Sequence, residues 1–107
     1  MKNSIKTLYN DIPVNLHINY MDNLINRVFK ILPLKEENSD TVEAYITNLL
    51  YELTGNKELI IYLNNDSRYE TILSNLQKLL SQDTNYRALV FNTITLITQI
   101  RDAERSE

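Results

Sequence analysis

Apolar residues recur every three or four positions along most of this sequence. The pattern begins between residues 4 and 12, where the apolar residues are Ile5, Leu8, Tyr9 and Ile12. Residues at this spacing share one face of an α-helix, so the segment is predicted to be a short amphipathic helix. Pro13 is expected to end it, because a proline disfavours helical geometry at the residue before it.

A longer helix is predicted from about Leu16 to Leu32. Its apolar stripe consists of Met21, Leu24, Ile25, Val28, Ile31 and Leu32. A stripe of this kind is the face that a surface helix buries against a core. Pro33 is expected to close the helix, and the polar residues 35–39 are interpreted as a solvated loop.

A third helix is predicted to begin at Asp40, because Asp40 and Glu43 resemble a capping box. The apolar residues that continue the helical period are Val42, Ile46, Leu49, Leu50 and Leu53. Gly55 is the only glycine in the chain. It is expected at the left-handed position that follows a helix, so the third helix is predicted to end there.

Two further helices are predicted in the second half of the chain. Ser67 and Glu70 match the capping-box spacing, and the helix that follows has the apolar face Tyr69, Ile72, Leu73, Leu76, Leu79 and Leu80. After the loop 81–84, the last helix is predicted from about Asn85 to Ala103. Its shared face would hold Tyr86, Leu89, Val90, Ile94, Ile97 and Ile100.

The pattern does not decide between helix and strand for two segments. Residues 58–63 and residues 93–98 are both rich in side chains that favour strands. A strand at 93–98 would have only residues 58–63 as a partner, which favours helix there. The fold class predicted is therefore all-α, with residues 1–107 forming a single domain. The architecture expected is an antiparallel four-helix bundle. Whether a short extra helix forms at about residues 57–63 stays open.

The composition supports a helical fold and excludes several classes of function. One glycine and two prolines are too few for a fold with many tight turns. There is no cysteine, so disulfides and thiolate sites are excluded. The net charge is −3 and the basic residues are scattered, so nucleic-acid binding is not expected. No secretory signal is recognised, and the longest apolar run, 59–63, is too short to span a membrane, so a cytoplasmic location is expected.

Candidate catalytic and metal-ligating residues are few. His17 is the only histidine, and zinc would need further ligands. His17 is open to a role as a general base, but a partly exposed polar residue is the favoured interpretation. The acidic residues 36–43 lack the glycine of a calcium loop and are interpreted as a charged helix start. No catalytic residues, cofactor or metal are therefore predicted, and the protein is not expected to be an enzyme.

Partner binding is the remaining class of function. Tyrosine and arginine are common in interfaces, and Tyr86 lies beside Arg87 in the sequence. The charged end of the chain is a second candidate surface. The predicted partner-binding residues are Asp83, Tyr86, Arg87, Arg101 and Arg105. Tyr9, Tyr45 and Tyr69 are instead expected at the edge of the core, with their hydroxyl groups in water.

Several features of residues 1–85 occur in an order that resembles one family. They are a short first helix holding Leu8-Tyr9-Asn10-Asp11-Ile12, a long amphipathic helix, a third helix followed by Asn56-Lys57, and a helix from Tyr69 to Leu80 containing Asn75-Leu76. In this order they resemble the enterocin A immunity family, the immunity proteins of pediocin-like bacteriocins. Two features depart from the family: residues 56–66 look like an extra element, and the segment after Thr84 is long and apolar.

The resemblance implies a fold, a partner and a location. Members of the family are antiparallel four-helix bundles in the cytoplasm of the producer. They bind a mannose phosphotransferase membrane transporter with its bound bacteriocin peptide from the inside, and specificity is associated with the C-terminal half. The alternative is a small helical regulatory binding protein, such as an antitoxin or a phage-encoded inhibitor. The oligomeric state stays open.

Overall fold

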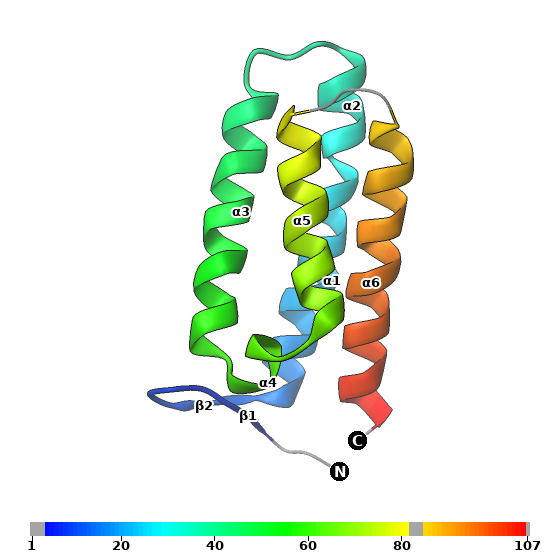
Figure 1. Cartoon of the computed structure of the whole chain (residues 1–107). Coiled ribbons are helices and arrows are strands. Elements are labelled where there is room, and N and C mark those ends of the chain that lie inside the picture. The colour runs from blue at the N-terminus through cyan, green and yellow to red at the C-terminus, as the bar shows by residue number, and fades with distance from the viewer. Residues whose placement is uncertain (1–3, 82–84, 107) are drawn as a thin grey trace.

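The computed structural model describes residues 4–81 and 85–106, which are mostly helical with a small antiparallel strand pair. The long helices are α1 (Val14–Phe29), α3 (Val42–Leu59), α5 (Ser67–Ser81) and α6 (Tyr86–Ser106). They lie side by side and alternate in direction along the chain (Figure 1). Helix α6 packs against both α1 and α5, and α5 packs against α3.

A single core runs between these helices. Its buried apolar residues are Ile5, Met21, Leu24, Val28, Ile31, Ile46, Leu49, Leu53, Ile60, Leu63, Tyr69, Ile72, Leu76, Leu79, Val90, Ile97 and Ile100. Most of them belong to the predicted stripes. Leu73 and Ile94 are partly buried against the same core. The helical period therefore identified the buried faces correctly from α1 onward.

The helix predicted over residues 4–12 is wrong. Strand β1 (Ser4–Lys6) pairs antiparallel with β2 (Asp11–Pro13). The Thr7 hydroxyl makes the turn between them, since its oxygen accepts the backbone N–H groups of Tyr9 and Asn10 at 3.2 and 2.9 Å. Burial of Ile5, which is 2% exposed, holds the hairpin against the helices. The expectation of an all-α fold thus holds for most of the chain and misses this strand pair.

The hairpin is joined to the segment that the sequence left open. Thr7 forms an isolated bridge with Ile60, and the Leu8 N–H donates to the Leu59 carbonyl at 3.0 Å. Helix α3 runs on to Leu59, Ile60 is extended, and α4 (Ile61–Asn64) follows. Residues 58–63 are therefore neither one strand nor one helix. The other open segment, residues 93–98, lies inside α6 and is helical, as favoured.

Three predicted helix boundaries are wrong. Pro33 does not close the second helix: α1 ends at Phe29, and Pro33 lies in the first turn of α2 (Ile31–Glu36), where a missing N–H costs nothing. Gly55 lies within α3 without a positive φ, since the helix continues until Ile60 joins the hairpin. The N-cap of α3 is Thr41, and no side chain caps it, so the predicted capping box at Asp40 is not formed.

The start of α5 differs from its prediction by one residue. The carboxylate of Asp66 accepts the backbone N–H of Arg68 at 2.8 Å. Asp66 thereby satisfies one of the free donors at this helix start, the role that the sequence assigned to Ser67. The apolar face predicted for α5 is confirmed, because Tyr69, Ile72 and Leu76 are buried.

Candidate functional site

Among the residues predicted to bind a partner, those that the structure describes lie at two ends of α6. Tyr86 and Arg87 begin α6, whereas Arg101 lies near its other end, roughly 21 Å further along the axis at 1.5 Å per residue. Asp83 and the side chain of Arg105 lie outside the described part of the structure. Sequence reasoning therefore identified residues at both ends of the molecule rather than a site.

Both described arginines of this set are engaged within the protein. The guanidinium of Arg87 pairs with Glu36 on α2 at 2.5 Å, and that of Arg101 pairs with Asp22 on α1 at 2.8 Å. Tyr86 is half-buried and lines a pocket of about 240 Å³ beside α2. The two ion pairs attach α6 to α2 and α1.

Several exposed apolar side chains belong to the hairpin of β1 and β2 with its turn, to α4 and to the first turn of α1, which meet at one end of the molecule. We call this end the hairpin pole (Figure 1). Its large exposed apolar residues are Leu8, Tyr9, Leu16 and Ile61, with 63%, 83%, 55% and 49% of their surfaces accessible. The prediction that the Tyr9 hydroxyl faces water agrees with this exposure. The apolar period had placed Leu8 and Tyr9 on a helix face, so this surface was not predicted.

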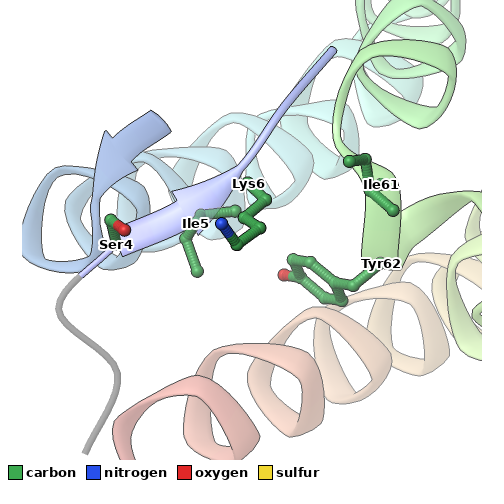
Figure 2. Close-up of a pocket in the computed structure, with 5 residues that line it drawn as sticks. All are labelled: Ser4, Ile5, Lys6, Ile61 and Tyr62. Carbon is green, nitrogen blue, oxygen red and sulfur yellow. The ribbon is translucent and has the colours of Figure 1, made fainter. Parts of the chain in front are cut away.

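A pocket of about 310 Å³ opens at the hairpin pole between β1 and α4 (Figure 2). It is lined by Ser4, Ile5, Lys6, Ile61 and Tyr62. The lining is mainly apolar, with the lysine as its charged member. The pocket exists because β1 diverges from α4 beyond the bridge between Thr7 and Ile60.

The side chain of His17 lies in the interior of the hairpin pole. It is 3% exposed, so the expectation of a partly exposed histidine is wrong. Its Nε2 lies 2.8 Å from the Tyr62 hydroxyl, and the two rings meet edge to face at 5.8 Å between centroids. His17 also lines a second pocket of about 180 Å³ with Leu16 and Ile60. Tyr62 thus lines the first pocket and His17 lines the second, and the hydrogen bond joins the two residues.

Charged groups surround this buried pair. Glu104 on α6 is 5% exposed. Burial raises the pKa of the Tyr62 hydroxyl, and the negative charges of Glu104 and Asp66 raise it further, so the phenol stays protonated. Arg68 donates to both carboxylate oxygens of Asp66, at 3.1 and 2.7 Å. The pole therefore combines an apolar rim with a hydrogen-bonded interior.

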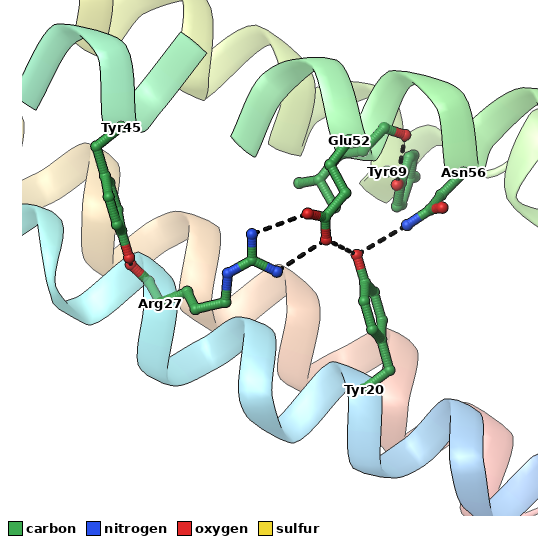
Figure 3. A network of polar contacts seen from close by, with 7 residues as sticks. Tyr20, Arg27, Tyr45, Glu52, Asn56 and Tyr69 are labelled. Atoms are coloured by element: carbon green, nitrogen blue, oxygen red, sulfur yellow. Dashed lines mark hydrogen bonds and ion pairs between the residues drawn. The ribbon is translucent and has the colours of Figure 1, made fainter. Parts of the chain in front are cut away.

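A separate polar network joins α1 to α3 (Figure 3). Arg27 donates to both carboxylate oxygens of Glu52, at 2.8 and 2.9 Å, and the Tyr20 hydroxyl donates to the same carboxylate. Asn56 donates to the Tyr20 oxygen at 2.9 Å. The bonds from Arg27 lower the pKa of Glu52, while burial and Glu52 raise the pKa of Tyr20 to about 12.

Two more tyrosine hydroxyls extend these contacts inward. The Tyr45 hydroxyl donates to the Arg27 carbonyl at 2.7 Å. Tyr69 is 1% exposed and its hydroxyl donates to the Leu53 carbonyl at 2.6 Å. The expectation that these hydroxyls lie in water is wrong, because each finds a backbone carbonyl of a neighbouring helix. The groups of the network satisfy one another, which suits it to holding helices in place.

Within residues 4–81 and 85–106, no group of three carboxylate or histidine side chains is placed to hold a metal ion. None of the helices in this part of the chain is long and apolar enough to cross a bilayer. No family model matches the chain, and no characterised protein or solved structure is significantly similar to it.

Proposed function

We propose that this protein binds a partner through the hairpin pole and that it is a bacteriocin immunity protein. In this proposal it folds as an antiparallel four-helix bundle in the cytoplasm of the producer. It engages the mannose phosphotransferase receptor with its bound bacteriocin. The observation that carries the proposal is that four large apolar side chains at the hairpin pole are exposed to water, a feature typical of interaction sites.

The arrangement of the helices supports the family part of this proposal. Long helices that alternate in direction fit the architecture that the resemblance implies. The tyrosine-opened helix is also present, as α5 with Tyr69 in its first turn. The short first helix of the family is replaced by a hairpin. The resemblance therefore rests on α1, α3 and α5, and the hairpin is this chain's own feature.

The contact surface proposed is an apolar one. Leu8 and Tyr9 are exposed in the turn between β1 and β2, and the Leu8 N–H joins this turn to the Leu59 carbonyl, two residues before Ile61. Removing such side chains from water on binding contributes about 25 cal/mol per Å² of apolar surface. We propose that this surface contacts the receptor with its bound bacteriocin from the cytoplasmic side.

Protection of living cells tests the proposal. The protein is expressed in strains sensitive to a panel of pediocin-like bacteriocins, and survival is measured. We expect protection against at least one peptide, and loss of that protection in the double variant Leu8→Ser, Tyr9→Ser. Tyr51→Ser is the matched control, because Tyr51 is equally exposed but lies on α3. Unchanged killing across the panel would contradict the immunity function.

The alternative is a small helical regulator, such as an antitoxin or a phage-encoded inhibitor. The acidic net charge of −3 and the helical fold fit this class equally. The neighbouring genes distinguish the two. A short precursor with a double-glycine leader next to this gene supports immunity, whereas a large toxin gene or a phage cassette supports the regulator.

A further inference from the structure

The pocket between β1 and α4 has the features of a binding site for one kind of chemical group. Ile5 and Ile61 supply aliphatic walls, and Tyr62 supplies the flat face of its ring. The ammonium of Lys6 and the Tyr62 side chain face the same space (Figure 2). Lining of this kind suits a ligand that is mainly apolar and carries a single negative group.

The charge of Lys6 is available to such a ligand. Its neighbour across the hairpin is Asp11, but within the described residues neither Asp11 nor another carboxylate forms an ion pair with Lys6. A lysine whose charge is not matched inside the protein attracts an anion. The Lys6 side chain is exposed, so its ammonium is accessible to a ligand.

The edge of β1 adds a backbone donor at the same place. On this edge, the Leu8 N–H donates to the Leu59 carbonyl. In an antiparallel strand the N–H groups of alternate residues point to the same side. The N–H of Lys6 therefore points toward α4 as that of Leu8 does, at the position where the strand has diverged from the helix. An extended chain can add to a strand edge of this kind.

We propose that the pocket binds a carboxylate attached to a short aliphatic group. Lys6 holds the carboxylate through its ammonium and its backbone N–H, and the aliphatic group lies between Ile5, Ile61 and the ring of Tyr62. A volume of about 310 Å³ is at the small end for ligand sites, so the ligand is no larger than a few residues. Two sources share this chemistry: a peptide ending in leucine or isoleucine, and a short fatty acid.

Titrations with matched ligands test this inference and separate the two sources. The full chain, labelled with ¹⁵N, is titrated with an acetylated tetrapeptide ending in leucine, the same peptide with an amidated end, octanoate and octanol. We expect the free acids to bind, with at least tenfold weaker binding of the amide and the alcohol. Amide signals of Lys6, Ile61 and Tyr62 should shift. Tighter binding of the peptide identifies a peptide end as the source, and tighter binding of octanoate a fatty acid.

A charge variant tests the role of the lysine. Lys6→Met keeps the aliphatic stem and should weaken binding of both acids about tenfold, with octanol unaffected. Lys78→Met on α5 is the control, because Lys78 is exposed at the opposite end of the molecule. Equal binding of acid and amide, shifts confined to other regions, or wild-type affinity in Lys6→Met would overturn the inference. These measurements need no bacteriocin, so they can fail or succeed independently of the protection assay.

Discussion

The Nε2 atom of His17 lies 2.8 Å from the hydroxyl oxygen of Tyr62, and this bond joins the first turn of α1 to α4. The two residues are 45 positions apart in the sequence. His17 is 3% exposed and Tyr62 is half-buried, so the bond is partly protected from water. The hydrogen bond is therefore expected to contribute to stability and to fix α4 against α1.

A double-mutant cycle measures this bond. Replacing His17 with Phe should lower the free energy of unfolding by about 1–3 kcal/mol, because a hydrogen bond to the half-buried Tyr62 hydroxyl is lost. Tyr62→Phe should cost a similar amount. In the double variant the loss of stability should be about 1 kcal/mol smaller than the sum of the losses in the two single variants, as measured by urea denaturation. Additive losses would mean that the bond contributes nothing.

The carboxylate of Glu52 should make the protein sensitive to acid. Arg27 lowers the pKa of Glu52 below its usual 4.5, so the ionised group stabilises the folded state above that value. This stability is lost as the pH falls through the lowered pKa. Glu52→Gln should therefore reduce the free energy of unfolding by about 1 kcal/mol near neutral pH, since the pair is partly exposed.

The pH dependence of that difference is the decisive measurement. Below the lowered pKa of Glu52, both proteins carry a neutral group at position 52, so the difference should shrink. Glu58→Gln is the control, since Glu58 is exposed on the same helix and its replacement removes the same charge. A constant deficit for Glu52→Gln over the whole range would contradict the assignment.

Gly55 should be replaceable with a gain in stability. It is a helical residue of α3 with a negative φ, and a methyl group added to it meets nothing within 4 Å. Alanine loses less backbone freedom on folding than glycine, so Gly55→Ala should raise the free energy of unfolding by about 0.5–1 kcal/mol. Thermal unfolding followed by circular dichroism checks this. A lower midpoint would mean that Gly55 adopts a conformation that alanine cannot.

Helix α6 should be essential for folding. Its inward residues Val90, Thr93, Ile97 and Ile100 have no exposed surface. A chain ending at Ser81 would leave the partner faces of α1 and α5 in water, so we expect it to lose its helical circular dichroism signal. A chain that lacks only residues 106 and 107 is the control and should stay folded. A folded 1–81 fragment would instead identify α6 as an appended recognition element.

The helices could be predicted because their apolar period reflects burial directly. The same period also indicates that His17 is buried, although this was not predicted. Residues 17, 21, 24 and 28 follow one helical stripe, so the buried place of His17 could have been read beside Met21, Leu24 and Val28. Its partner Tyr62 could not, because the bond depends on how α4 lies after the turn at Ile60.

The hairpin could not be separated from a helix by periodicity alone. Ile5, Leu8, Tyr9 and Ile12 have helical spacing, yet only Ile5 is fully buried. The signals for a turn were the hydroxyl of Thr7 and the extended conformation that Pro13 favours at Ile12. The hairpin is selected by its contact with Leu59 and Ile60. These two residues lie some fifty positions away in the chain. The exposed surface and the pocket that depend on this contact were therefore hidden from the sequence.

The position of β1 and of the end of α6 has a practical consequence. Both Ser4 and Ser106 belong to elements that finish at the hairpin pole (Figure 1). A fluorescent reporter joined directly to Ser4 or to Ser106 would crowd the surface through which the protein is proposed to act. The turn between α2 and α3, at the opposite end, is the better attachment point, because its residues Glu37 and Asn38 are exposed. An inactive fusion protein would then report on the place of attachment rather than on the protein.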